Sequence, residues 1–169
     1  MKKLVLALSV IAFTACNNNQ QKEQNTQESN KPVTEETVAP AETGNENVIT
    51  INGGDDMKFD KTELKTKAGE TVKLILKHVG KAPIEAMGHN VVVLAQGTDL
   101  NVFANAAIDA KDNGYIPKGM KNAVIAKTDV IGGGQTAETT FTAPAEGSYD
   151  FLCSFPGHYI NMKGKLIVE

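Results

Sequence analysis

The 169-residue chain contains no tryptophan and no arginine, and it has only two cysteines. Aromatic residues make up 5% of the sequence, and the formal net charge at neutral pH is -3. Neutralising the phosphates of a nucleic acid takes clustered basic side chains, and no such patch occurs along this chain. Because a basic patch is lacking, nucleic acid is not an expected partner.

The N-terminus has the pattern of an export signal. A basic start is followed by a short apolar run over residues 4–13, which is too short to span a bilayer as a helix and is typical of a secretory signal. The signal ends in FTAC, which resembles a bacterial lipobox, although Phe13 stands where leucine is usual. We expect residues 1–15 to be removed and Cys16 to be lipidated. The alternative is an ordinary signal peptide and a soluble periplasmic protein.

The sequence from Cys16 to Asn47 is polar and of low complexity. It contains no aromatic residue and almost no apolar one, so it cannot bury enough surface to offset its chain entropy. Residues 16–47 are therefore predicted to be a disordered tether that joins a lipid anchor to a folded domain at residues 48–169.

Cys153 has no partner for a disulfide if Cys16 carries a lipid. A single thiol exported to an oxidising compartment needs a reason to stay unpaired. Binding to a metal is one such reason, because a bound thiolate is buried and occupied.

Residues 48–169 show the signals of an all-β fold. The segment at 71–79 alternates apolar and polar residues at the period of two expected of a strand. The run at 89–95 is continuously β-branched, as in a strand buried on both faces. Further candidate strands, bounded by Gly, Pro, Asn or Asp, lie at 47–53, 122–131, 137–143, 147–155 and 164–169. Seven to eight short strands with regular turns favour a Greek-key β-sandwich.

One segment, residues 97–114, does not follow the strand pattern. Its apolar residues recur at helical spacing, and Asp99 stands near the start as a candidate cap. These apolar residues are Leu100, Phe103, Ala104 and Ala107. We predict one short helix inserted between strands.

Soft, electron-rich side chains gather near the C-terminus. The segment CSFPGHYINMKG at 153–164 holds Cys153, His158 and Met162, and MGHN far upstream offers His89. One thiolate and two imidazoles with a long axial thioether form the blue-copper arrangement. Structural zinc usually takes Cys and His without Met, often as Cys-x-x-Cys, which this sequence lacks. We therefore expect one type 1 copper ion per chain.

The two motifs resemble those of azurins, which are type 1 copper proteins of the cupredoxin fold. MGHN at 87–90 and CSFPGHYINMKGKL at 153–166 match closely, while DDMKFD at 55–60, LKHVG at 76–80 and VIGGGQ at 130–135 match more loosely. The resemblance covers roughly residues 48–169. Four residues separate Cys153 from His158, whereas plastocyanins have only two, so the spacing favours the azurin type.

The resemblance implies a role for each residue of the site. His89, Cys153 and His158 would be the strong equatorial ligands of copper. Met162 would be a weak axial ligand, and the carbonyl oxygen of Gly88 would approach from the opposite side.

The resemblance also implies support around these ligands. The backbone N–H groups of Asn90 and Phe155 would donate to the sulfur of Cys153 and so tune the reduction potential. The Asn90 side chain would join the two ligand-bearing segments. Two features common in azurins, a disulfide near the start of the sandwich and a buried tryptophan, are missing from this sequence.

A docking surface is a further expectation from the resemblance. Met57, Met87 and Met120, together with Phe155 and Pro156, would surround an exposed edge of His158 and contact redox partners. His78 is expected to be a partly buried histidine at a strand end and not a ligand.

The expected function is one-electron transfer by a monomeric, non-enzymatic protein in a bacterial cell envelope, in the periplasm. Its partners would be redox proteins such as cytochromes or copper or haem reductases, and its lipid would bind a membrane. The alternative is a copper-binding protein for storage, buffering or delivery. A nucleophile and base pair of Cys153 and His158 is disfavoured, because no orienting Asp or Asn motif accompanies them.

Overall fold

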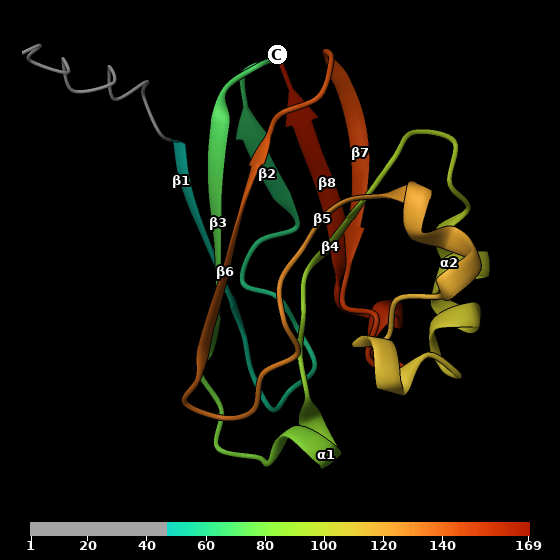
Figure 1. The fold of residues 1–169 in the computed structure, drawn as a ribbon. Coiled ribbons are helices and arrows are strands. Elements are labelled where there is room, and N and C mark those ends of the chain that lie inside the picture. Colours follow the sequence, from blue (N-terminus) through green and yellow to red (C-terminus); the bar gives the residue numbers. More distant parts are fainter. Residues whose placement is uncertain (1–46) are drawn as a thin grey trace, which may run out of the picture. The chain divides into compact units, whose positions relative to one another are not determined.

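The structure, a computed structural model, describes residues 47–169. The predicted signal peptide, the predicted lipidation site Cys16 and nearly all of the predicted tether lie outside the described residues. Within residues 47–169 the strands form two sheets (Figure 1). Apolar side chains from both sheets form one hydrophobic cluster between them, so the predicted cupredoxin-like β-sandwich is confirmed.

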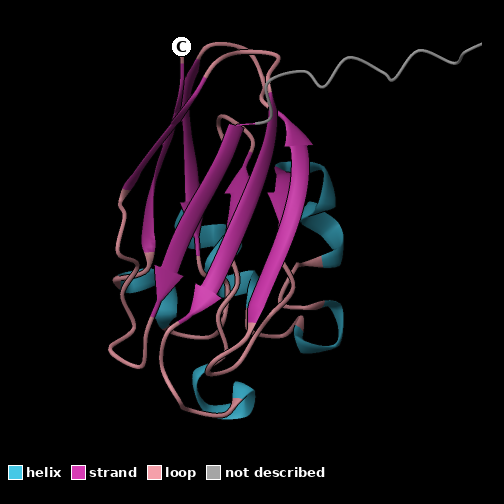
Figure 2. Cartoon of the chain, turned by 90° about the vertical axis from the view of Figure 1, so that its left-hand side faces the viewer, coloured by secondary structure: helices cyan, strands magenta, loops and turns pink. Residues whose placement is uncertain are grey.

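The first sheet has three strands in the order β1-β3-β6, and Figure 2 shows it facing the viewer. Its strands are β1 (Asn47–Gly53), β3 (Thr71–His78) and β6 (Thr136–Thr142). Strands β1 and β3 are parallel, and β3 and β6 are antiparallel. Alternate residues of β3, from Val72 to His78, are buried, as the period-two pattern predicts.

The second sheet has five strands in the order β2-β8-β7-β4-β5. Its strands are β2 (Glu63–Thr66), β8 (Lys163–Val168), β7 (Gly147–Leu152), β4 (Val92–Leu94) and β5 (Val124–Lys127). Strands β7 and β8 form an antiparallel pair, and β4 lies antiparallel to both β7 and β5. Strand β4 thus lies directly beside β7, the central strand, which ends next to Cys153.

The β-branched run around β4 is buried on both faces. Val91 and Val93 pack into the cluster between the sheets. Val92 and Leu94 pack into a second cluster with Phe103 of helix α2 (Leu100–Ala107). Because α2 covers the outer face, both faces of this run are apolar.

Helix α2 begins as predicted. The carboxylate of Asp99 accepts hydrogen bonds from the backbone N–H groups of Asn101 at 2.8 Å and Val102 at 3.0 Å. These bonds satisfy two of the N–H groups that a helix start leaves without partners.

Several short elements of the structure were not predicted from the sequence. They are helix α1 (Ile84–Met87), strand β2, and the 3₁₀ turns η1 (Lys111–Asn113), η2 (Lys118–Ala123) and η3 (His158–Ile160). The prediction of a single inserted helix was therefore incomplete. Helix α1 has four residues and no side-chain cap, so it is too short to show a periodic pattern.

In Figure 1, α1 lies at the end of the sandwich opposite to the C-terminus, and β4 begins near it. Strand β7 runs toward the same end, and its connection to β8 follows there. No helix within residues 47–169 combines the length and the apolar character needed to cross a membrane.

Candidate metal centre

Three of the predicted ligands converge in the folded chain. The donor atoms of His89, Cys153 and His158 all lie within 4.8 Å of one another. The Cys153 Sγ atom is 4.0 Å from Nδ1 of His89 and 3.8 Å from Nδ1 of His158, and the two Nδ1 atoms are 3.1 Å apart. All three side chains are buried. Both imidazoles therefore present the same ring nitrogen to the sulfur.

The ends of neighbouring strands place these donors together. His89 follows α1 and forms an isolated bridge with Ile131, with backbone N–O distances of 3.0 and 2.8 Å. Cys153 follows β7 directly. Its N–H donates to the carbonyl of Met162 at 2.9 Å, which closes the base of the ligand loop, defined here as residues 153–162. His158 begins the η3 turn within this loop.

Met162 and Gly88 lie beside the same cluster. Met162 is completely buried, and a Cβ atom at Gly53 would lie 3.0 Å from Cε of Met162 and 3.1 Å from Cδ2 of His89. The backbone therefore comes close to both side chains at Gly53. The Gly88 carbonyl oxygen is 4.0 Å from Sγ of Cys153. Both groups lie near the residues that would hold a metal, and their roles as ligands stay predictions.

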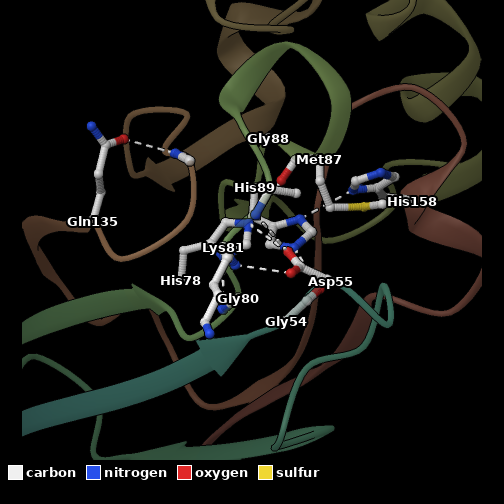
Figure 3. Close-up of polar contacts among 12 residues, drawn as sticks. Gly54, Asp55, His78, Gly80, Lys81, Met87, Gly88, His89, Gln135 and His158 are labelled. Carbon is white, nitrogen blue, oxygen red and sulfur yellow. Dashed lines mark hydrogen bonds and ion pairs between the residues drawn. The ribbon is translucent and has the colours of Figure 1, made fainter.

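A backbone carbonyl fixes the tautomer of His89. Nε2 of His89 lies 2.9 Å from the carbonyl oxygen of Gly54 and must carry the proton, because a carbonyl oxygen only accepts hydrogen bonds. Nδ1 is then unprotonated and faces the cluster (Figure 3). The second hydrogen bond of a ligand histidine sets its ring orientation in this way.

Both imidazoles are held in the neutral form. Burial lowers the pKa of His89. Burial, followed by the repulsion of His89 and His78, lowers the pKa of His158 to about 4. A neutral imidazole has a free lone pair for a metal, so the rings are ready to bind one at neutral pH.

The Cys153 thiol is completely buried. Burial raises its pKa to about 12, and the backbone N–H groups of Asn90 and Phe155 act against this rise. Their role as hydrogen-bond donors to the copper-bound sulfur stays a prediction. Because a metal binds the thiolate, metal binding must release the proton from this thiol.

The Asn90 side chain joins the two ligand-bearing segments, as expected. Its Oδ1 accepts from the Ser154 N–H at 2.8 Å, and its Nδ2 donates to Ser154 Oγ at 2.8 Å and to the Gly114 carbonyl at 3.3 Å. Both Asn90 and Ser154 are buried. Asn90 follows His89 and Ser154 follows Cys153, so these hydrogen bonds link the backbone segments that carry the two predicted ligands.

His78 lies beside the donor cluster but not in it. Its ring stacks on His89 with a centroid distance of 4.3 Å and an interplanar angle of 18°. Its Nδ1 accepts from the Gly80 N–H at 3.1 Å, and its Nε2 donates to the Met87 carbonyl at 2.8 Å. Backbone groups therefore occupy both ring nitrogens, and His78 is fully buried, more deeply than expected.

The predicted docking residues lie in different surroundings. Met57 is exposed in the loop after β1, while Met87 ends α1 and Pro156 lies in the ligand loop, both half-buried. In the view of Figure 3, the Met87 side chain extends in the direction of His158. Phe155 is buried and packs on the His158 ring at a centroid distance of 4.7 Å.

Met120 differs from the other methionines. It lies in η2 and packs against the second cluster, which α2 covers, together with Tyr159. Met120 is half-buried, so part of its side chain packs against this cluster, and its docking role stays a prediction.

Two groups that support the site were not predicted from the sequence. Ser154 is the main partner of Asn90, and its position next to Cys153 was the only signal for it. The Gly54 carbonyl fixes the tautomer of His89, and a backbone carbonyl has no signature in the sequence.

The donor set fits copper. A thiolate and a thioether are soft ligands that suit Cu(I), and imidazoles suit both oxidation states of copper. Zinc sites built from Cys and His usually have four such ligands and no methionine. His89, Cys153 and His158 would hold one type 1 copper ion, with Met162 beside them.

Replacing Met162 with leucine is expected to leave copper bound and to raise its reduction potential. Cu(II) carries the larger charge and therefore loses more stabilisation than Cu(I) when even a weak donor is removed, and leucine supplies no donor atom. Redox titration of the copper-loaded protein measures the effect. Met120→Leu is the matched control and should keep the original potential. A fall in potential on Met162→Leu would count against an axial role.

Comparisons with known proteins agree with this site. The profile of a family described as copper binding proteins, plastocyanin/azurin family, matches residues 45–169. An azurin of Alcaligenes faecalis is 41% identical over 122 residues, which cover 70% of this chain and 94% of that protein. Outer membrane protein H.8 of Neisseria meningitidis serogroup B is 36% identical over 120 residues, which cover 69% of this chain and 64% of that protein.

A solved structure gives the same result. The "blue" copper protein auracyanin A of Chloroflexus aurantiacus superposes with a TM-score of 0.66 at 37% identity, over 73% of this chain and 99% of that one. The family profile, which matches residues 45–169, spans the two sheets and the converging side chains described above. The chain therefore belongs to the plastocyanin/azurin family of copper-binding proteins.

Proposed function

We propose that this protein carries single electrons between redox proteins of a bacterial cell envelope. When bound, copper supplies a Cu(I)/Cu(II) couple that gains or loses one electron. The protein makes and breaks no bond in a substrate, so it acts as a carrier and not as an enzyme.

The observation that carries this proposal is the enclosure of a preformed donor set. His89, Cys153, His158 and Met162 are each no more than 4% exposed. The backbone carbonyl of Gly54 orients one of these imidazoles, and the hydrogen bond at the loop base fixes the ends of the ligand loop. Ligands held in this way move little when the copper changes its charge, and a small structural change favours fast electron exchange.

Copper storage or delivery is the alternative function. A delivery protein must release its metal to a partner, which favours open sites with ligands near the surface. The burial of all four side chains favours a retained metal. Within residues 47–169, His89, Cys153 and His158 form a single cluster of metal-binding side chains, so the described part of the chain offers no second copper centre of the kind expected in a copper oxidase.

The test is to load the protein with copper and to cycle it between oxidised and reduced states. A carrier should be blue when oxidised, from charge transfer between thiolate and Cu(II), and should give a type 1 EPR signal. It should also keep its copper over repeated cycles in the presence of a Cu(I) chelator. Loss of the metal to the chelator on the first reduction would favour the delivery function.

Docking would take place around His158. Its Nδ1 faces the cluster, so its Nε2 lies on the side of the ring that points away from Cys153. Met57, Met87 and Pro156 would form an apolar rim there. We propose that a redox protein such as a cytochrome or a copper or haem reductase docks on this rim and exchanges its electron through His158.

A Met57→Lys change is expected to slow electron transfer to such a partner several-fold without altering the absorption spectrum. A charge on an apolar docking surface must be desolvated when the partner binds. Val48→Lys is the matched control, because Val48 is also exposed, 55% against 37% for Met57, but lies in β1. Stopped-flow absorbance measures the electron-transfer rates. Equal rates for the two variants would refute the docking role of Met57.

The proposed location rests on the N-terminus and on one relative. The FTAC motif would lead to lipidation of Cys16, and residues 17–47 would hold the copper domain away from the membrane. A relative that matches over most of this chain is named an outer membrane protein. Mass spectrometry of the mature protein tests this proposal, because an unmodified Cys16 would refute the lipid anchor.

A further inference from the structure

We propose that Asp55 is a positioning residue for the copper ligand His89. Its carboxylate clamps the loop after β1 onto the backbone after β3, and this clamp holds the Gly54 carbonyl on Nε2 of His89. The inference deepens the proposed function, because it concerns the same copper site.

The clamp consists of hydrogen bonds between two loops far apart in the sequence. Asp55 Oδ2 accepts from the Lys81 N–H at 2.8 Å, and Oδ1 accepts from the Ala82 N–H at 3.2 Å. Figure 3 shows Asp55, Gly54 and Lys81 next to the His89 ring. A carboxylate that accepts two backbone N–H groups forms a stronger link than a neutral acceptor does.

The backbone at Gly80 approaches the carboxylate closely on one side, although the Asp55 side chain is 43% exposed. A Cβ atom at Gly80 would lie 2.1 Å from Oδ1 of Asp55, which is closer than any contact a side chain tolerates. Glycine at this position thus allows Asp55 to reach the two N–H groups. A side chain introduced at Gly80 would therefore displace the carboxylate without changing Asp55 itself.

The link from Asp55 to the copper ligand passes through one peptide. Gly54 directly precedes Asp55, and its carbonyl accepts from Nε2 of His89 at 2.9 Å. The same loop contains Met57 in the left-handed region at φ 53°, a conformation that is uncommon for a residue with a side chain. A loop in this conformation needs fixed contacts to keep its shape, and the Asp55 clamp supplies two of them.

Charge supports the same assignment. The Lys81 N–H is the main cause of the lowered pKa of Asp55, so the side chain is ionised at neutral pH. The carboxylate lies 4.0 Å from Nε2 of His78, but that nitrogen already donates to Met87. The partners of Asp55 are therefore backbone groups, as a loop clamp requires.

The first experiment compares Asp55→Asn with Asp56→Asn in the metal-free protein by ¹⁵N NMR of the histidine rings. Asparagine keeps the shape of the side chain and one acceptor oxygen, but its NH₂ group cannot accept from the second N–H. In the unchanged protein, His89 should be protonated on Nε2. Asp55→Asn should add a population protonated on Nδ1, and Asp56→Asn, which removes the same charge from the same loop, should not.

The second experiment measures the Cu(II) dissociation constant of the same proteins. Loss of a partner that orients a metal ligand weakens binding about 10–100-fold, and this loss is expected for Asp55→Asn. The dissociation constant of Asp56→Asn should stay within about twofold of that of the unchanged protein, which is far below the 10–100-fold range. Gly80→Ala, which displaces the carboxylate but keeps its charge, should behave like Asp55→Asn.

The proposal is overturned if Asp55→Asn keeps the tautomer of His89 and the copper affinity of the unchanged protein. Should both variants fail to fold, hydrogen exchange in the unchanged protein decides. The clamp requires slow exchange of the Lys81 and Ala82 amides, and exchange at the rate of an open loop would refute it. The NMR result needs no copper, so failure of the clamp is distinguishable from failure of the electron-carrier function.

Discussion

Replacing Cys153 with serine is expected to abolish the blue absorption band of the oxidised, copper-loaded protein completely. The band arises from charge transfer between the thiolate and Cu(II), and a hydroxyl group supplies no such electron donor. Sγ of Cys153 lies within 4.0 Å of Nδ1 of both His89 and His158, and Cys153 is the only cysteine among residues 47–169. Visible absorption and EPR spectra measure the change.

Cys16→Ser is the matched control for this prediction, since it makes the same chemical change at the second cysteine of the chain. The control protein should keep the full band. The metal-free Cys153→Ser protein should unfold cooperatively, because serine differs from cysteine by one atom. A blue band that persists in folded Cys153→Ser protein would refute Cys153 as the ligand.

Replacing Asn90 with alanine is expected to lower the free energy of unfolding of the metal-free protein by about 2–4 kcal/mol. Each buried polar group left without a partner costs about 1–3 kcal/mol, and the change removes partners from both the N–H and the hydroxyl of Ser154. Ser154 is only 1% exposed, so water cannot readily replace the lost bonds. Urea unfolding followed by circular dichroism measures the effect.

The Asn90→Ala change should also alter the copper site. Asn90 joins the backbone next to His89 to the backbone next to Cys153, so its loss should broaden the blue band and speed the loss of copper. Asn52→Ala is the matched control, because the Asn52 amide bonds the exposed Asp60 at 2.7 Å. The control should cost only about 0.5 kcal/mol. Equal losses for the two variants would show that Asn90 does not join the segments.

Much of the fold could be predicted because its causes are local. The alternation in β3 and the Asp99 cap are patterns within a few residues. The β-branched run around β4 indicated burial on both faces, although its second cover, α2, was not assigned to that face from the sequence. The ligand types were also readable, since Cys153, His158 and Met162 stand close together and have few other reasons to do so.

The parts that could not be predicted depend on contacts between distant segments. The hydrogen bond between the Gly54 carbonyl and His89 joins residues that are far apart in the sequence. Every residue has a backbone carbonyl, so the sequence does not indicate which one accepts this bond. The packing of Met120 under α2 depends on how η2 is placed. Strand β2 has only four residues and is defined by its parallel pairing with β8, so its own sequence contains too little signal.

The donors are carried almost entirely by one of the two sheets. His89 leads into β4, Cys153 leaves β7 and Met162 leads into β8, and β4, β7 and β8 are neighbours in that sheet. If the two layers slide or separate slightly as the sandwich vibrates, the distances among these side chains are therefore preserved. Such relative motion would act on the ring of His89 through its hydrogen bond to Gly54, which follows β1, and through the stacked ring of His78, which ends β3. Slippage between the layers would thus reach the copper site through the His89 imidazole and through Met162, whose Cε lies beside Gly53 at the end of β1.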